Sequence, residues 1–269
     1  MAIGKGTGCF MDIDLTKFDI LQISISGGKD SQVTLLEMVK LAERQKVRHR
    51  LRAVLSETGA DWKESPEHCR YLCEKLNVPF SIVYPTWTIP DYIDHRLRFP
   101  SAACRFCTSL KTGSLDKAIR HLAPARERER RILSITGERR EESSHRAKLE
   151  EFELNEKLTA GNREVCNYRP ILDYNVGEIW EKIKNHGLKA HPAYEVYGNE
   201  RLSCALCVLA CENDIRNGAI ARPDLAERYL ALERKSGHTF RYKRSLADIL
   251  ASPGKPKPIE PEAIQLTLF

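Results

Sequence analysis

The segment Ile23-Ser-Ile-Ser-Gly-Gly-Lys-Asp-Ser31 changes abruptly from a β-branched apolar run to two glycines and small polar residues. The apolar run reaches back to Phe18 and predicts a buried strand, and apolar spacing over residues 31–43 predicts a helix. A strand that ends at glycines and opens a helix gathers backbone N–H groups that bind phosphate. We therefore expect a phosphate-binding loop made of Ser26, Gly27, Gly28, Lys29, Asp30 and Ser31.

Each side chain of this loop has an expected role. Lys29 supplies a positive charge, and Ser26 and Ser31 supply hydroxyl donors. Asp30 would repel a phosphate directly, so we expect it to hold Mg²⁺ or to cap backbone amides. The segment lacks the G-x-x-x-x-G-K-[ST] pattern and is therefore not a Walker loop.

Strands and helices alternate outward from this loop. Strands are predicted at 51–59, 78–85 and 130–140, with helices at 65–77 and 223–235. The order of the strands and helices up to residue 140 predicts an α/β fold with a doubly wound parallel sheet. Ligands of such sheets bind beyond the carboxyl ends of the strands, so the turns at Ser26, Glu57 and Gly137 should share one site.

The chain is expected to have three parts. Residues 1–165 would form the nucleotide-binding domain, residues 166–250 a small helical, cysteine-containing and metal-binding region, and residues 251–269 a flexible tail rich in proline and lysine. A hydrophobic content of 42% and a charged content of 30% indicate a soluble globular protein. No apolar run is long enough for a membrane span, and no secretory signal is visible, so a cytoplasmic location is expected. The net charge of +6 is compatible with phosphate-rich partners.

Nine cysteines are present, several at x₂ spacing, which in a cytosolic chain indicates metal binding or redox chemistry rather than disulfides. Cys104-Arg-Phe-Cys107 and Cys204-Ala-Leu-Cys207 could together form a Cys₄ metal site. Sulfur ligands suit both a [4Fe–4S] cluster and Zn²⁺, while unrelated buried thiols or a redox dithiol are the alternatives. Cys211 could be an alternate ligand or a sulfur carrier, but we interpret it as a buried helical thiol.

Several motifs resemble known enzymes. "SGGKDS" (26–31) resembles the PP-loop of the ATP pyrophosphatase superfamily (adenine nucleotide α-hydrolase-like), whose members bind ATP and release pyrophosphate. "SETGADWKE" (56–64), "GERREESSHRA" (137–147) and residues 168–204 are similar to segments of its phosphoadenosine-phosphosulfate reductase branch. The second of these matches the pattern G-x-R-x-x-x-S-x-x-R. It implies an anion site formed by Gly137, Arg139, Ser143 and Arg146.

"CRFCTSLKTG" (104–113) resembles the cysteine-and-lysine segment of the ATP pyrophosphatase component of DNA phosphorothioation systems of the Dnd/Ssp type. This resemblance implies that Lys111 faces the anion site. The branch resemblance favours a [4Fe–4S] cluster over Zn²⁺. True reductases of the branch have a degenerate loop and a late catalytic cysteine, whereas this loop is intact and no cysteine follows Cys211.

The resemblance therefore implies adenylation, with Mg²⁺ and ATP as cofactors and Lys29, Asp30, Arg139 and Lys111 as catalytic residues. An acceptor oxygen attacks the α-phosphate, Lys29 and Mg²⁺ stabilise pyrophosphate, and a sulfur nucleophile then displaces AMP. DNA phosphorothioation, with a cysteine desulfurase as sulfur donor, is the expected function. The alternatives are a phosphoadenosine-phosphosulfate reductase-like oxidoreductase and an ATP-dependent module of a phage or mobile element.

The last predicted feature is Gln265-Leu-Thr-Leu-Phe269. It resembles the Q-L-x-L-F peptide by which bacterial DNA-processing proteins dock on the sliding clamp. Two leucines and a phenylalanine on a disordered tether indicate insertion into a partner's pocket. The alternative is that the tail packs on its own domain.

Overall fold

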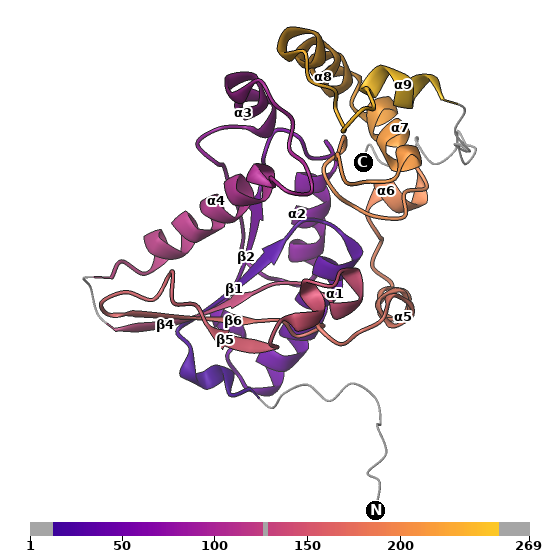
Figure 1. Cartoon of the computed structure of the whole chain (residues 1–269). Helices are drawn as coiled ribbons and strands as arrows, with labels where there is room; N and C mark the ends of the chain where they lie inside the picture. Colours follow the sequence, from indigo (N-terminus) through magenta and orange to yellow (C-terminus); the bar gives the residue numbers. More distant parts are fainter. Residues whose placement is uncertain (1–12, 126–128, 253–269) are drawn as a thin grey trace, which may run out of the picture. The chain divides into compact units, whose positions relative to one another are not determined.

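The computed structural model describes residues 13–125 and 129–252. Six strands form one sheet in the order β3-β2-β1-β4-β6-β5 (Figure 1). β1 is parallel to both β2 and β4, β4 is parallel to β6, and the edge strand β5 is antiparallel to β6. The strands are β1 (Ile20–Ile25), β2 (Leu51–Ser56), β3 (Phe80–Val83), β4 (Arg130–Ile135), β5 (Phe152–Leu154) and β6 (Arg163–Tyr168).

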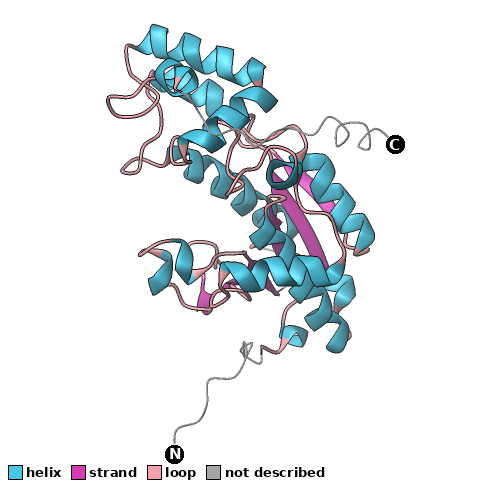
Figure 2. Cartoon of the chain, turned by 90° about the vertical axis from the view of Figure 1, so that its right-hand side faces the viewer, coloured by secondary structure: helices cyan, strands magenta, loops and turns pink. Residues whose placement is uncertain are grey.

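Helices flank the strands (Figure 2), and α1 packs against α5. The predicted α/β fold with a mostly parallel sheet is therefore confirmed, as are the helices expected at 31–43, 65–77 and 223–235. The α-helices are α1 (Lys29–Arg44), α2 (Ser65–Lys75), α3 (Ile89–Arg96), α4 (Phe106–Leu122), α5 (Val176–His186), α6 (Pro192–Glu195), α7 (Glu212–Ala221), α8 (Pro223–Ser236) and α9 (Leu246–Ala251). Short 3₁₀ helices are η1 (Leu15–Lys17), η2 (Arg48–Arg50), η3 (Arg140–Glu142) and η4 (Arg146–Lys148).

The sheet positions the loop that follows β1. Leu21 and Ile23 are fully buried, as expected for a central strand covered on both faces. The strand order reverses beside β1, because β2 and β3 extend the sheet to one side and β4 continues it on the other. Ligands of open α/β sheets bind at such a reversal, so the fold presents residues 26–31 where a ligand is expected.

The chain forms two compact units, each made of discontinuous segments. Unit 1 contains the residues up to 55, then 69–81 and 115–189; unit 2 contains 56–68, 82–114 and the residues from 190 on. This division differs from the expected boundary after residue 165. The physical reason is that β6 is hydrogen-bonded to β4 and α5 packs on α1, so both belong with the sheet. Gln265–Phe269 and Cys9 lie outside the described residues.

Unit 2 has its own apolar core, in which Phe99 packs edge-on against Tyr229 and Phe240, each with a ring-centroid distance of 5.5 Å. Trp62 and Ile93 belong to the same cluster. No helix within the described ranges is long and apolar enough to cross a membrane.

Two buried histidines of unit 2 predict acid sensitivity. His191 Nδ1 accepts a hydrogen bond from the Ala193 amide at 3.0 Å, and its Nε2 lies 3.1 Å from Ser65 Oγ. The ring of His68 packs edge-on against it at 5.2 Å. Burial lowers the pKa of His68 to about 4; burial, together with the charge of His68, lowers the pKa of His191 to about 3.

We expect stability to fall as the pH drops from 6.5 towards 4. In that window the unfolded chain binds protons that the folded chain does not, so stability is full above the unfolded pKa and is lost on acidification. Each histidine contributes a slope of about 1.4 kcal/mol per pH unit. Urea titrations at several pH values measure this slope. His68→Leu should reduce it, the exposed-residue control His49→Gln should leave it unchanged, and a flat profile in the parent would contradict the assignment.

Candidate functional site

The loop between β1 and α1 has the geometry of a phosphate-binding turn. Gly27 adopts φ of +80°, a left-handed conformation that favours glycine. Gly28 is the N-cap of α1, and no side chain within the described residues caps that helix end. Ser31 Oγ donates to the Gly28 carbonyl at 2.9 Å and accepts from the Ser26 amide at 3.2 Å. The serines therefore hold the loop in shape, and the helix N-terminus is left available for an anion.

Gly137, in the turn after β4, lies directly against the first turn of α1. A Cβ at this position would stand 2.6 Å from Thr34 Oγ1 and 3.0 Å from the backbone of Asp30. Only glycine allows this close approach without a shift of the helix. The structure thus brings Gly137 to the loop of residues 26–31, as the sequence predicted.

Asp30 forms an ion pair with Arg139. Arg139 Nε donates to Asp30 Oδ1 at 2.6 Å, and Lys29 Nζ lies 3.3 Å from Asp30 Oδ2. Arg139 is only 4% exposed. Burial disfavours its charged form, but Asp30, with Glu142 and Glu141, outweighs burial and raises the pKa of the guanidinium. Asp30 is thus held between two cations instead of capping a backbone amide, and its role as a Mg²⁺ ligand stays a prediction.

Ser143 and Arg146 belong to an adjoining network. Arg146 pairs with Glu142 at 2.6 Å and with Glu138 at 3.5 Å, while Ser143 Oγ accepts from the Arg146 amide at 3.2 Å. The other oxygen of Glu142 accepts from the Arg139 amide at 2.9 Å, which links this network to the loop. Because carboxylates already neutralise Arg146, an anion would have to displace them, and its role as an anion ligand stays a prediction.

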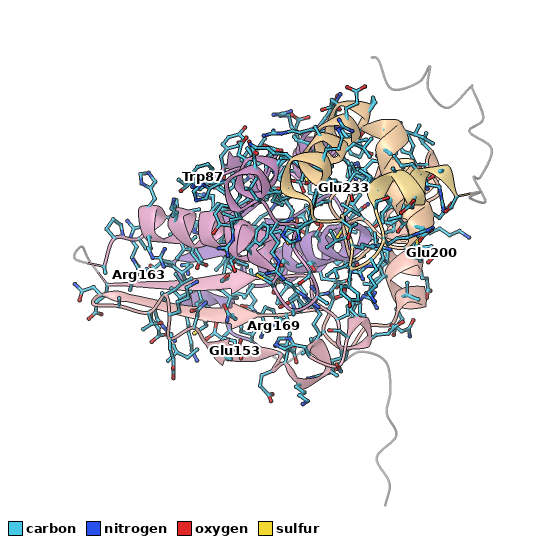
Figure 3. The ribbon with its side chains drawn as sticks, turned by 45° about the horizontal axis from the view of Figure 1, so that its top comes forward. Trp87, Glu153, Arg163, Arg169, Glu200 and Glu233 are labelled. Carbon is cyan, nitrogen blue, oxygen red and sulfur yellow. The ribbon has the colours of Figure 1, made fainter. Side chains whose placement is uncertain are left out.

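A neighbouring arginine extends this pattern. Arg169 pairs with Glu138 at 2.9 Å and with Glu153 at 2.7 Å, and Figure 3 shows Glu153 and Arg169 beside each other. Arg169 is buried and its pKa is raised, since the ion pairs outweigh the opposing effect of burial. The arginines that follow β4 and β6 are therefore ion-paired with carboxylates.

Glu57 and Lys111 lie in unit 2. Glu57 Oε1 accepts from the Gly59 amide at 2.8 Å and so closes the turn after β2. Lys111 lies on α4. Burial, Asp61 and Cys207 raise the pKa of the Cys204 thiol, and the charge of Lys111 acts in the opposite direction. The predicted role of Lys111 at the anion site stays a prediction.

Three of the four predicted metal ligands line one small cavity of unit 2, about 30 Å³ in volume. These are Cys107, Cys204 and Cys207, and Tyr229 lines the same cavity. Cys104 is exposed and is not among the lining residues; it lies in a turn where its amide donates to Ser101 Oγ at 3.1 Å. We call this space the thiol cavity.

Within residues 13–125 and 129–252, no three histidine, cysteine, aspartate or glutamate side chains are arranged as a metal site. The type of donor does fit a thiophilic metal. Burial and the charge of Cys207 raise the pKa of Cys107, so the thiols disfavour one another's ionised forms, and a cation would relieve that repulsion. Cys107, Cys204 and Cys207 are therefore the residues that would hold a [4Fe–4S] cluster or Zn²⁺, with Cys104 as the predicted fourth ligand.

Backbone contacts fix the second cysteine pair. The Ala205 amide donates to the Ala60 carbonyl at 2.9 Å, and Trp62 Nε1 donates to the Ser203 carbonyl at 3.2 Å. Gly218 of α7 packs against Ala205 so closely that a Cβ would stand 1.7 Å from its carbonyl oxygen. The segment that carries Cys204 and Cys207 is thus held by two different elements of unit 2.

The interpretation of Cys211 as a buried helical thiol is wrong. Cys211 is exposed and is the N-cap of α7, where its sulfur accepts from the Asp214 amide at 3.4 Å. Sequence reasoning also missed Tyr229, whose pKa is raised by burial and then by Cys204 and Cys207. In the sequence, Tyr229 occupies one of the apolar positions of the helix predicted at 223–235, so no signal distinguished it from a core residue.

Comparison with protein families identifies the fold family. The model of the phosphoadenosine phosphosulfate reductase domain matches residues 20–210. The chain belongs to this family. The matched residues include the loop at 26–31 and both cysteine pairs. The resemblance of 137–147 and 168–204 to this branch is thereby supported at the level of the family.

Among curated proteins, the chain is 32% identical over 163 residues to a 37.8 kDa protein from the gpa 5′ region of Escherichia phage 186. The match covers 60% of this chain and 47% of the phage protein, so the chain spans about half the length of this relative.

Solved structures resemble the chain in fold. An FMN adenylyltransferase of Candida glabrata has a TM-score of 0.51 at 14% identity, over 93% of this chain and 73% of that one. A phosphoadenylyl-sulfate reductase of Candida auris scores 0.48 at 12% identity, over 71% and 83%. A tRNA thiolase of Methanococcus maripaludis, solved with its [4Fe–4S] cluster, scores 0.48 at 15% identity, over 84% and 74%.

Proposed function

We propose that this chain is an ATP pyrophosphatase that adenylates an oxygen of nucleic acid and prepares it for sulfur insertion, with the DNA backbone as the acceptor. The observation that carries the proposal is the loop of residues 26–31. It combines a left-handed Gly27, an uncapped helix N-terminus at Gly28 and the buried cation Lys29. This combination suits the triphosphate of ATP with Mg²⁺.

The chemistry has two steps. An acceptor oxygen bonds to the α-phosphorus of ATP as the bond to the β-phosphate breaks, and Lys29 stabilises the departing pyrophosphate. When the acceptor is a backbone phosphate, the terminal sulfur of a persulfide then bonds to that phosphorus as AMP leaves. A second thiol then attacks the cysteine sulfur of the remaining S–S bond; a disulfide forms between the two thiols, and the phosphorothioate leaves with the other sulfur. A cysteine desulfurase is the proposed source of the persulfide.

The thiol cavity supports sulfur chemistry. It gathers Cys107, Cys204 and Cys207. A [4Fe–4S] cluster bound there would supply redox or sulfur-binding chemistry, whereas Zn²⁺ would stabilise the fold of unit 2 without taking part in the reaction. The protein's own contribution is a partly buried group of three cysteine side chains.

The test uses anaerobically purified full-length chain whose iron and zinc contents are measured. With Mg²⁺ and ATP, we expect pyrophosphate release that nucleic acid stimulates. With a persulfide-loaded desulfurase, we expect phosphorothioate linkages, detected by mass spectrometry after nuclease digestion. Iron-replete protein that releases no pyrophosphate with DNA or RNA would exclude the proposed activity.

A second candidate function is a reductase that acts on phosphoadenosine phosphosulfate, and the family match favours it. Its signature is sulfite release from that nucleotide with a dithiol reductant and no requirement for ATP. Sulfite release without pyrophosphate release would select this function over adenylation.

Residues 265–269 are proposed to recruit the enzyme to the bacterial sliding clamp, which places it on DNA in the cytoplasm. Deletion of Gln265–Phe269 should abolish pull-down by purified clamp and leave pyrophosphate release on free DNA unchanged. A second variant, Phe269→Ala, should weaken the same pull-down, because it removes the aromatic ring expected to enter the partner's pocket. Retained pull-down in the deletion variant would rule out this docking peptide.

A further inference from the structure

A second, larger cavity of unit 2 adjoins the thiol cavity. Its volume is about 600 Å³, and the two cavities share lining residues between 99 and 101 and at Val208 and Leu209. Residues 98–103 form one part of its lining and residues 238–242 another. We call it the side groove. A molecule bound there would lie next to the cavity of Cys107, Cys204 and Cys207.

The side groove is basic. None of its lining residues is acidic, while Arg98, His238 and Arg241 carry basic side chains. Arg98 is exposed and forms no ion pair with any described residue. This contrasts with Arg139, Arg146 and Arg169 of unit 1, which are all paired with carboxylates. The charge of the groove therefore complements an anionic ligand.

A tight turn at one side of the groove presents an aromatic ring to solvent. Arg241 and Arg244 exchange two backbone hydrogen bonds of 3.0 Å, which places Tyr242 and Lys243 at the tip. The Tyr242 side chain is 89% exposed, so it adds little to the folding free energy. Lys243 Nζ lies 5.3 Å from the centre of its ring.

This turn is firmly anchored. Arg241 Nε donates to the Val208 carbonyl at 2.7 Å, and Arg244 Nη2 donates to Ser252 Oγ at 2.7 Å. Glu233 of α8, labelled in Figure 3, accepts from the amides of Phe240 and Leu246, which flank the turn. The exposed ring is therefore held in one place, as a preorganised binding surface requires.

From this arrangement we propose that the side groove binds an unpaired segment of the nucleic-acid acceptor, with a phosphate on Arg98 and a base stacked on Tyr242. The inference rests on the proposed function and adds to it the place where the acceptor lies. Base stacking on an exposed aromatic ring, combined with a basic groove, is how proteins hold single strands without reading sequence.

The size of the groove favours an unpaired segment over a duplex. A volume of about 600 Å³ is in the range that encloses a drug-sized ligand, and this corresponds to one or two nucleotides. Bases of a duplex are stacked on one another and cannot offer a face to Tyr242. The shared wall with the thiol cavity would bring the bound backbone close to the cysteines.

The test is fluorescence anisotropy of a short fluorescein-labelled oligothymidylate with the anaerobic full chain. Tyr242→Ala should raise the dissociation constant at least about fivefold, and Tyr242→Phe should retain binding because it keeps the ring. Arg98→Ala should weaken binding and reduce the slope of log affinity against log salt by about 0.7. Tyr84→Ala and Arg234→Ala are matched controls, since both residues are exposed and lie in unit 2 outside the groove lining.

Several outcomes would overturn the inference. Unchanged oligonucleotide binding by both Tyr242→Ala and Arg98→Ala would do so, as would a duplex of the same length that binds as tightly as the single strand. If these variants instead lose only pull-down by purified cysteine desulfurase, the groove is a protein-docking surface and the inference is wrong.

Two results distinguish failure of the proposed adenylation from failure of nucleic-acid binding in the side groove. If the oligonucleotide binds through the groove but the chain releases no pyrophosphate, the result supports nucleic-acid binding in the groove and contradicts the proposed adenylation. Conversely, if nucleic acid stimulates pyrophosphate release equally in the parent and in both groove variants, the result supports the proposed adenylation and contradicts nucleic-acid binding in the side groove.

Discussion

Lys29→Ala lowers the rate of pyrophosphate release by about 100- to 1,000-fold, the loss typical when one preorganised charge-stabilising donor is removed. The Lys29 side chain is buried in the loop at the start of α1, with its ammonium 3.3 Å from Asp30. Its charge is thus fixed where the phosphates of ATP are expected. Steady-state pyrophosphate release with Mg²⁺, ATP and nucleic acid measures the effect.

The fold should survive this change. Asp30 keeps its 2.6 Å contact with Arg139, so no buried carboxylate loses its only cation. Lys40→Ala, an exposed position on the same helix, is the matched control and should keep the parent rate. Circular dichroism should show the same unfolding midpoint for both variants. A Lys29→Ala variant with normal pyrophosphate release would contradict the assignment of residues 26–31 as the ATP site.

Gly218→Ala destabilises unit 2 by about 2 kcal/mol or more, because the added methyl group overlaps backbone. Its Cβ would stand 1.7 Å from the carbonyl oxygen and 2.6 Å from the carbonyl carbon of Ala205. Helix propensity alone favours alanine over glycine by about 1 kcal/mol, but backbone atoms cannot rotate away as a side chain does. Either α7 or the segment between Cys204 and Cys207 must move.

Gly113→Ala is the matched control for this prediction. Gly113 also lies inside a helix, in the part of α4 that belongs to unit 2, and a Cβ there meets nothing within 4 Å. We expect that variant to be stabilised by up to about 1 kcal/mol, opposite in sign to Gly218→Ala. Urea unfolding followed by circular dichroism compares the two. Equal stabilities would mean that α7 does not press on Ala205.

Features that depend on local sequence were predictable. The run before Ser26 and the glycines after it specify a strand, a turn and a helix within about a dozen residues, and α1, α2 and α8 follow apolar periodicity. The approach of Gly137 to the loop followed from the rule that parallel strands end at one edge. These predictions need only local periodicity and sheet topology.

Features that depend on side-chain partners were not predictable. Arg146 sits in the expected motif, yet whether it faces an anion or a carboxylate depends on Glu138 and Glu142 in the fold. Exposure of Tyr242 depends on how Arg241 and Arg244 anchor its turn, and no periodicity encodes that.

The discontinuous make-up of unit 2 has a consequence for biosynthesis. Cys107 leaves the ribosome about a hundred residues before Cys204, an interval of roughly 5–20 s at typical translation rates. During that interval its thiol has no partner segment, while β4, β5 and β6 are synthesised and can complete the sheet. The thiol cavity is therefore completed late, and the nascent chain exposes the first cysteine pair to oxidants before the second pair exists.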